Sequence, residues 1–283
     1  MKPVSSLLLP VAKHFIAGTT ISDVIEQGKI LNAKGYKIIA NFLGEDVISD
    51  DAIENTVQEY LNLYDLLDEN RIAGSVSVKL TQLGLTLSNE KAILNLKRIL
   101  DKAKSLDRYL WLDMEGSKYT DSIIEIYLSA LKEYNNVGLA IQAYLKRTES
   151  DLDRILPKGG QVRLCKGAYN EPASIAIKKR PDIRENYKKL LKKLFEQGNF
   201  FAIATHDEDL ISFAAELSKQ SNVQNFEFQV LKGVREDMQA RILGNGYTVS
   251  IYLPYGKEWL PYAIRRIRER RRNIFLLFRA LLG

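Results

Sequence analysis

Hydrophobic and polar positions alternate along eight short segments of the chain, and a polar, helix-compatible segment follows each of them. The segments are 36–43 (YKIIANFL), 74–80 (GSVSVKL), 108–114 (RYLWLDM), 137–145 (VGLAIQAYL), 161–166 (QVRLCK), 200–206 (FFAIATH), 226–231 (FEFQVL) and 247–253 (YTVSIYL). Alternation over such short lengths is typical of β-strands, and strands that alternate with helices favour a parallel sheet. Eight strands close a (β/α)8 barrel, so we predict an α/β protein of the TIM-barrel class.

The polar positions of these strands predict an unusually polar barrel interior. The apolar face of each strand must meet the surrounding helices, so the opposite face points into the lumen. Lys79, Asp113, Arg163 and Glu227 belong to that opposite face. We place all four at the C-terminal mouth, where barrel enzymes carry their sites. Buried polar groups without partners cost about 1–3 kcal/mol each, so these side chains must pair with one another, with water or with a ligand.

The two flanks of the strand pattern are helical. Thr20 to Asp23 offers N-cap chemistry, and apolar residues recur at helical spacing as far as a plausible stop at 32–35. We therefore divide the chain into an N-terminal helical segment, 1–35, with additional helices, and a barrel domain, 36–283. At the other flank, Pro254 and Gly256 are predicted to end a strand, and a helix is predicted to begin close to Lys257.

The predicted C-terminal helix carries polar residues where a core stripe is expected. Tyr262, Arg265, Arg266 and Glu269 stand at i, i+3, i+4 and i+7 and line one face. This face has two interpretations. It is either a solvated face with an Arg265–Glu269 pair, which stabilises a helix by about 0.2–0.5 kcal/mol, or one wall of a functional site.

Composition narrows the class of protein. The 283 residues fit one α/β barrel, and the chain is 46% hydrophobic and 27% charged, as in ordinary soluble proteins. No apolar run approaches the roughly 18 residues of a spanning helix, and the first fifteen residues make an unconvincing signal peptide, so we expect a cytoplasmic protein. With one cysteine, Cys165, and two histidines, we expect neither an internal disulfide nor a metal site.

The net charge of +6 is modest and is concentrated in the arginines of 265–272. Such a run is typical of a solvated or membrane-facing helix. Because no base-stacking aromatic residues are interleaved with it, we do not expect a nucleic-acid partner.

Five motifs, in order along the chain, resemble those of the flavin-dependent proline dehydrogenase family. They are Gln142-Ala143-Tyr144, Arg163-x-x-Lys166-Gly167-Ala168-Tyr169, Ala204-Thr205-His206, Phe226-Glu227-Phe228-Gln229-x-Leu231, and Tyr252-x-Pro-x-Gly followed by Tyr262-x-x-Arg265-Arg266-x-x-Glu269. The resemblance implies FAD as cofactor, L-proline as substrate, Δ1-pyrroline-5-carboxylate as product and a quinone as electron acceptor. It implies hydride transfer from proline C5 to flavin N5. Since the sequence stops at Gly283, we expect a monofunctional enzyme without an aldehyde dehydrogenase module.

The resemblance also implies roles on the substrate side. Lys79, Arg265 and Arg266 would hold the proline carboxylate, which guanidinium groups bind bidentately. Asp113 would orient Lys79 and offset the positive charge. The remaining substrate-binding positions are Tyr252 and Tyr262, against the pyrrolidine ring, and Leu231 and the Ala168 backbone, which shape the pocket.

On the cofactor side, the resemblance implies flavin contacts from eight residues of the barrel: Met114, Gln142, Arg163, Lys166, Gly167, Ala168, Thr205 and His206. Arg163 would lie near flavin N5 and, with Asp113, is a predicted catalytic residue; the acid that pairs with Arg163 is left open. Glu269 would reach the flavin edge or tether Arg265. His206 and Cys165 also have ordinary interpretations, as a structural histidine and a small packing residue.

Two other functions fit the same residues. A Schiff-base enzyme of the aldolase kind would use Lys79 as its nucleophilic amine with Asp113 beside it. A nucleic-acid-binding module would use the arginines of 265–272. The apolar tail at 274–282 suggests either peripheral contact with an anionic membrane or a last helix that caps the barrel. The oligomeric state is left open.

Overall fold

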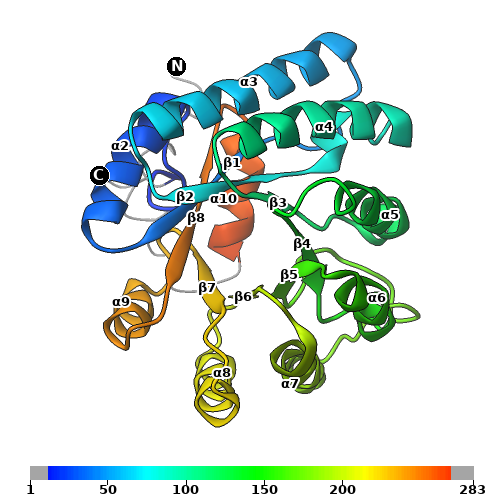
Figure 1. Cartoon of the computed structure of the whole chain (residues 1–283), viewed down its shortest axis with the longest axis vertical. Helices are drawn as coiled ribbons and strands as arrows, with labels where there is room; N and C mark the ends of the chain where they lie inside the picture. The colour runs from blue at the N-terminus through cyan, green and yellow to red at the C-terminus, as the bar shows by residue number, and fades with distance from the viewer. Residues whose placement is uncertain (1–11, 269–283) are drawn as a thin grey trace.

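The protein is described by a computed structural model in which residues 12–268 are placed, and within them eight parallel strands close into a barrel (Figure 1). The strands are β1 (Lys37–Phe42), β2 (Gly74–Val78), β3 (Leu110–Leu112), β4 (Val137–Gln142), β5 (Gln161–Cys165), β6 (Phe201–Ala204), β7 (Phe226–Leu231) and β8 (Val249–Tyr255). Each strand pairs with the next along the chain, and β8 pairs with β1. The predicted (β/α)8 fold is confirmed.

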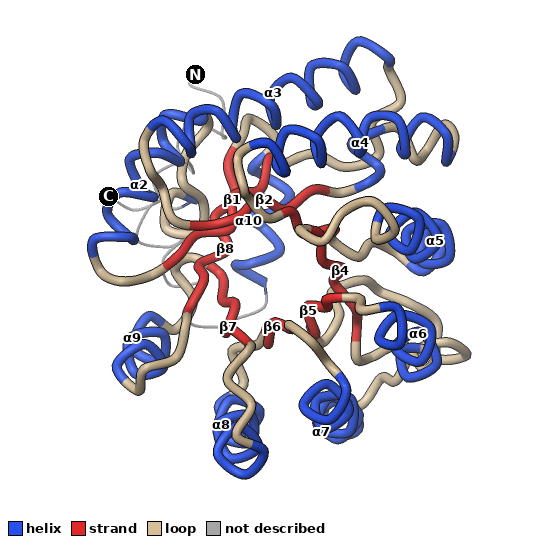
Figure 2. Tube along the Cα trace, viewed as in Figure 1, coloured by secondary structure: helices blue, strands red, loops and turns tan. Residues whose placement is uncertain are grey.

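Helices surround the barrel, with one exception. The α-helices are α2 (Ile21–Ala33), α3 (Asp50–Glu69), α4 (Asn89–Ser105), α5 (Thr120–Ala130), α6 (Thr148–Ile155), α7 (Arg180–Gln197), α8 (Glu208–Ser221), α9 (Glu236–Gly244) and α10 (Trp259–Arg268). Three 3-10 helices lie in loops: η1 (Leu80–Leu83), η2 (Ser117–Tyr119) and η3 (Leu156–Lys158). Figure 2 shows α3 to α9 in an outer ring, whereas α10 projects inside the ring of strands.

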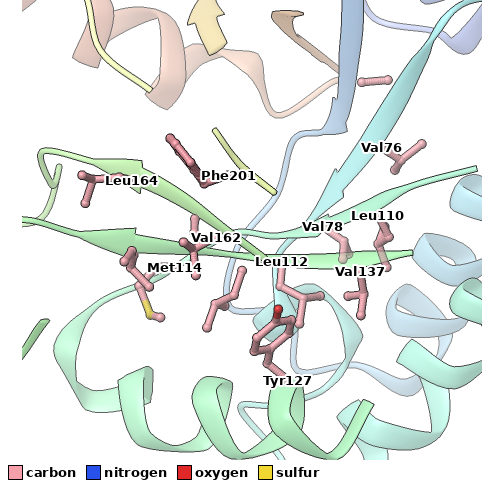
Figure 3. Packing of buried hydrophobic residues seen from close by; sticks show 14 of the residues in the cluster. Val76, Val78, Leu110, Leu112, Met114, Tyr127, Val137, Val162, Leu164 and Phe201 are labelled. Atoms are coloured by element: carbon pink, nitrogen blue, oxygen red, sulfur yellow. The ribbon is translucent and has the colours of Figure 1, made fainter. Parts of the chain in front are cut away.

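The core lies between the strands and the outer helices. Val76, Val78, Leu110 and Leu112 are fully buried there, and Tyr127 of α5 points toward the same layer (Figure 3). Burial of one such aliphatic side chain stabilises the fold by about 1.5–3 kcal/mol. Because these residues face the helices, the alternate residues of the same strands are left for the lumen, as the alternation predicts.

The last strand has the predicted length but lies two residues further along the chain, at Val249–Tyr255 instead of 247–253. β8 continues to Tyr255, two residues beyond the predicted end, because Pro254 and Tyr255 stand opposite Asn41 and Phe42 of β1. The strand ends before Gly256, whose φ of +127° suits glycine. α10 begins at Trp259, close to its predicted start.

The first described residues pack against α10. Phe15 and Ile16 are fully buried and pack in one cluster with Trp259 and Tyr262. The backbone N–H of Ala17 donates to the carbonyl of Pro254 at 2.8 Å, so this segment also holds the end of β8. The helical segment that follows has the predicted start, since Thr20 and Asp23 form a capping box at the N-terminus of α2.

None of the helices within residues 12–268 is long and apolar enough to cross a membrane.

Candidate active site

A cavity opens at the carboxyl ends of the strands, beneath α10. It encloses about 1140 Å³, part of which is open to solvent. Fourteen of the residues that the sequence predicts for the site line it: Lys79, Asp113, Met114, Gln142, Arg163, Lys166, Gly167, Ala168, His206, Leu231, Tyr252, Tyr262, Arg265 and Arg266. The parallel strands and α10 thus bring together residues that are spread over 188 positions of the chain, from Lys79 to Arg266.

Asp113 lies at the centre of the polar layer in the lumen. Its Oδ1 accepts from Ser77 Oγ at 2.7 Å and from Arg163 Nη1 at 2.6 Å. Its Oδ2 accepts from Tyr252 Oη at 2.6 Å and from Lys79 Nζ at 3.2 Å. The acid that pairs with Arg163, left open by the sequence, is therefore Asp113, and it also pairs with Lys79 as predicted.

This pairing fixes the charges of the layer. Burial by itself would raise the pKa of Asp113, but Lys79 and Arg163 outweigh it and hold the pKa at about 2. Burial opposes the charge of Lys79, and Asp113 and Glu45 outweigh that effect, so the pKa of Lys79 is raised. The pKa of Tyr252 is raised by burial and by Asp113. At neutral pH the layer thus holds an aspartate anion, two cations and a neutral phenol.

Two aromatic rings contact the guanidinium of Arg163. Its guanidinium carbon lies 4.7 Å from the centre of the Trp111 ring and 5.7 Å from that of Tyr252. Its side chain is only 5% exposed. Cation–π contact and the hydrogen bond from Nη1 to Asp113 Oδ1 restrict the orientation of the guanidinium, which would suit a group that presents a donor to a ligand.

The short helix η1 fixes the backbone at Lys79. The Gln82 side chain accepts from the Lys79 N–H and from Tyr60 Oη, both at 3.1 Å, and donates to the Phe42 carbonyl at 2.7 Å. Gln82 is 1% exposed. These bonds connect the ends of β1 and β2, from which Glu45 and Lys79 enter the cavity.

Glu45, which sequence reasoning missed, joins the two cationic parts of the site. One of its carboxylate oxygens, Oε1, lies 3.9 Å from Lys79 Nζ and 3.7 Å from Arg265 Nη2. The neighbouring Arg266 lies over the Tyr262 ring, with 5.4 Å between the guanidinium carbon and the ring centre. Glu45 follows β1 at the carboxyl end of a strand, and that position is the signal that could have found it.

A second charged group flanks the cavity at the ends of β5 and β6. Lys166 Nζ and Arg184 Nε both bond to Asp207 Oδ2, at 2.5 and 3.0 Å. Next to Lys166, Gly167 has a φ of +115°, and a Cβ added there would lie 2.1 Å from the Tyr144 ring. The glycine therefore lets this backbone run close against the barrel wall.

His206 has a structural bond and lines the cavity as well. Its Nε2 accepts from the Leu231 N–H at 2.9 Å, which makes Nδ1 the protonated nitrogen of the neutral ring. The position of His206 therefore agrees both with a structural histidine and with a residue that contacts a cofactor in the cavity.

One expectation is wrong, and two others stay predictions. Glu227 is wrong as a residue of the C-terminal mouth: it is the second residue of β7 and, with Ser250, lines a separate pocket at the opposite end of the barrel, where its carboxylate accepts from Ser250 Oγ and from Gln229 Nε2. Thr205 does not line the cavity, and its Oγ1 accepts from the Asp207 N–H at 3.2 Å. Glu269 and the residues after it lie outside the described residues.

Tyr144 also departs from the alternation. β4 ends at Gln142, and Tyr144 packs with Leu145 and Ala176 outside the lumen. The strand period does not extend past the last paired residue.

The residues that line the cavity have buried polar atoms that could form hydrogen bonds with a large polar ligand such as a flavin. Within the described residues, Arg163 Nε, Asn41 Oδ1 and Gln229 Oε1 are buried without a hydrogen-bond partner, and all three residues line the cavity. A ligand that offers both donors and acceptors satisfies such atoms, whereas an apolar ligand does not. The residues present therefore fit the cofactor that the resemblance implies. Within residues 12–268, no group of three His, Cys, Asp or Glu side chains could hold a metal.

Comparison with known proteins gives one consistent family. The model of the family described as "Proline dehydrogenase" matches residues 24–274. Proline dehydrogenase 1 of Bacillus subtilis is 33% identical over 96% of this chain and 90% of its own length. Proline dehydrogenase of Deinococcus radiodurans is 32% identical over 96% of this chain and 90% of its own length.

A solved structure has the same fold. Proline utilization A of Bdellovibrio bacteriovorus, inactivated by N-propargylglycine, has a TM-score of 0.87 at 21% identity. It matches 94% of this chain, which spans about a third (33%) of that longer protein.

Proposed function

This chain belongs to the proline dehydrogenase family, and we propose that it is a FAD-dependent enzyme that oxidises L-proline to Δ1-pyrroline-5-carboxylate and passes the electrons to a quinone. The observation that carries the proposal is the meeting of Lys79, Arg265 and Arg266 with the buried Asp113–Arg163 pair in one cavity. The cations are arranged to bind a small carboxylate, and the buried pair is arranged to hold a donor in place.

The substrate carboxylate is bound by the three cations at the mouth. Lys79 stays protonated because its pKa is raised, and both arginines are permanently charged. The rings of Tyr252 and Tyr262 limit the space that is available to the aliphatic part of the substrate ring. Tyr252 is held in place by its hydrogen bond to Asp113. Proline combines one carboxylate with a small ring of aliphatic carbons and one amine nitrogen, and both the carboxylate and the ring carbons have matching groups here.

The other side of the cavity is assigned to the cofactor. Arg163, Gln142, His206 and the Lys166–Ala168 turn would hold it, and bound FAD supplies the two-electron acceptor for proline C5. Arg163 is oriented by Asp113 to donate a hydrogen bond and to stabilise the negative charge that grows during the transfer. The protein holds the reacting groups in place and excludes water from them.

The Schiff-base alternative is disfavoured by the state of Lys79. A nucleophilic lysine must lose its proton near neutral pH, and such lysines have a lowered pKa. The pKa of Lys79 is raised instead, because Asp113 and Glu45 outweigh the effect of burial.

The test is the absorbance spectrum of the purified protein, with and without L-proline. We expect a yellow protein whose flavin bands bleach without oxygen on addition of L-proline and persist with D-proline. Lys79→Met should need far more proline for the same bleaching, while the surface control Lys97→Met should behave as the parent, since Lys97 is half-exposed in its pair with Glu133. A colourless protein that cannot take up FAD, or borohydride trapping of a carbonyl substrate on Lys79, would overturn the proposal.

We place the enzyme in the cytoplasm, and the apolar tail at 274–282 motivates peripheral contact with the inner face of the membrane, where a quinone is found. That tail lies outside the described residues. Co-sedimentation with anionic vesicles at low salt tests this part, and a protein that stays in the supernatant would refute it.

A further inference from the structure

Glu115 is a buried carboxylate beside the substrate side of the cavity, and none of the roles above uses it. It is 3% exposed. Its two oxygens accept from one residue: Oε1 from the Thr81 N–H at 3.1 Å and Oε2 from Thr81 Oγ1 at 2.5 Å. The end of β3 is thereby tied to η1, 34 residues earlier in the chain.

Thr81 in turn connects Glu115 to the chain segments that carry Lys79 and Glu45. It stands two positions after Lys79. Its Oγ1 accepts from the Asp46 N–H and its carbonyl accepts from the Val47 N–H, both at 3.2 Å. Asp46 and Val47 directly follow Glu45, so Thr81 fixes the loop that carries Glu45 against the segment that carries Lys79.

We propose that Glu115 is a positioning residue of the carboxylate site: in its ionised form it holds Thr81, and through Thr81 it keeps Lys79 and the Glu45 loop in the arrangement that binds the substrate carboxylate. The inference rests on the proposed function, because it assigns Glu115 to the same site.

The hydrogen-bond count favours the ionised form. Thr81 presents two donors to Glu115, its N–H and its hydroxyl; a carboxylate offers a strong acceptor to each, whereas a protonated carboxyl keeps only one strong acceptor oxygen. A protonated Glu115 would have to donate to Thr81 Oγ1, which already accepts from the Asp46 N–H, and the Thr81 hydroxyl proton would lose its acceptor.

The ionised form is present over only part of the physiological pH range. Burial raises the pKa of Glu115 to about 7, against the two bonds from Thr81 and the charge of Lys79, while Glu45 adds to the rise. Lys118 and Tyr169 also interact electrostatically with this carboxylate. We therefore expect the carboxylate site to loosen as the pH falls from about 8 to about 6.

Charge alone predicts the opposite result. Glu115 is an anion near the cationic site, so its neutralisation should strengthen the binding of another anion. If the role of Glu115 is to hold Thr81, its neutralisation should weaken that binding. The sign of the effect therefore separates the two explanations.

The experiment is calorimetric titration of the holoenzyme with tetrahydrofuran-2-carboxylate, in which the ring nitrogen of proline is replaced by oxygen. This ligand has no amine that titrates between pH 6 and 8. We expect the parent enzyme to bind it about tenfold more weakly at pH 6 than at pH 8. Glu115→Gln should bind it weakly, as the parent does at pH 6, at both pH values. Thr81→Val, which keeps the charge of Glu115 but removes the hydroxyl, should also bind weakly, and Thr81→Ser should restore binding.

Glu171→Gln is the matched control. Glu171 accepts in the same way from the N–H and Oγ of Ser117, at 2.7 and 2.6 Å, and does not line the cavity. It should leave both the affinity and its pH dependence unchanged. Unchanged or tighter binding in Glu115→Gln and Thr81→Val, or an equal loss in Glu171→Gln, would overturn the inference. A parent enzyme that neither binds the ligand nor is bleached by L-proline would refute the proposed function instead.

Discussion

Replacement of Asp113 by asparagine should be the most damaging isosteric change in the lumen. The carboxylate accepts four hydrogen bonds, two on each oxygen, from Ser77, Arg163, Tyr252 and Lys79. An asparagine offers an acceptor on one side only, and its amide protons then face either Arg163 or the Lys79–Tyr252 pair. Because the amide is neutral, both Lys79 and Arg163 lose this counterion, and one of them also faces an N–H donor, whichever way the amide turns.

The magnitude follows from burial. Removal of one partner of a buried ion pair costs about 3–5 kcal/mol, because the other charge stays desolvated. The side chains of Asp113 and Arg163 are 11% and 5% exposed, so this range applies. We expect Asp113→Asn to lower the free energy of unfolding by about 3–5 kcal/mol and to misalign Arg163, with a loss of about two to three powers of ten in kcat/KM.

The assay is equilibrium unfolding in urea at pH 7.5, with kcat/KM measured on the same preparations. Glu133→Gln is the control, since it removes a carboxylate from an exposed pair with Lys97, in which the side chains are 62% and 51% exposed. Such pairs contribute about 0–1 kcal/mol. If Asp113→Asn destabilised the protein no more than Glu133→Gln, the ionised, doubly paired state of Asp113 would be refuted.

Three further predictions concern other parts of the site. Arg266→Met should lower kcat/KM for proline by about two to three powers of ten, because the carboxylate loses one of its three cations at a cost of about 3–5 kcal/mol; near-normal kinetics would remove the carboxylate assignment. Gly167→Ala should lower FAD content, measured by absorbance, because its Cβ would lie 2.1 Å from Tyr144. Gly246→Ala, which also has a positive φ (+85°) but no neighbour within 4 Å, should keep the flavin. Glu115→Gln should become more stable relative to the parent as the pH rises. The folded state raises the pKa of Glu115 from 4.5 to about 7, so the parent loses up to about 3 kcal/mol of stability as the pH rises between these values. Thermal unfolding of both proteins at pH 5 and pH 8 tests this. A difference in stability between variant and parent that is the same at both pH values would contradict it.

The barrel and most of the cavity could be predicted from the chain alone. The period of two in segments such as 74–80 is a direct consequence of a strand with helices on one face and a lumen on the other. Parallel strands then place their carboxyl ends at one mouth, so Lys79, Asp113 and Arg163 could be grouped without any coordinates. Their exact partners could not, because a hydrogen bond depends on rotamers and on register rather than on spacing.

Loop residues were harder to predict than strand residues. Glu45 and Glu115 lie in loops just after β1 and β3, so their position marks them as candidates, but their partners at Lys79 and on η1 come from the folding of those loops, which no local pattern describes. Glu227 was misplaced for a related reason: the alternation gives the face of a residue but not its height in the barrel. Height is set by strand stagger, which places Glu227 beside Ala202, at the start of β6.

The pairing of β1 with β8 has a consequence for the order in which the protein is made. β1 finds its second partner, β8, only after some 200 further residues have been synthesised, which takes roughly 10 to 40 s on a ribosome. Until then β1 is an open edge, and Phe15 and Ile16 lack the surface of Trp259 and Tyr262 that later covers them. A chain whose synthesis stops before β8 therefore has a sheet with two unpaired edges. We expect such nascent chains to bind a chaperone that shields strand edges.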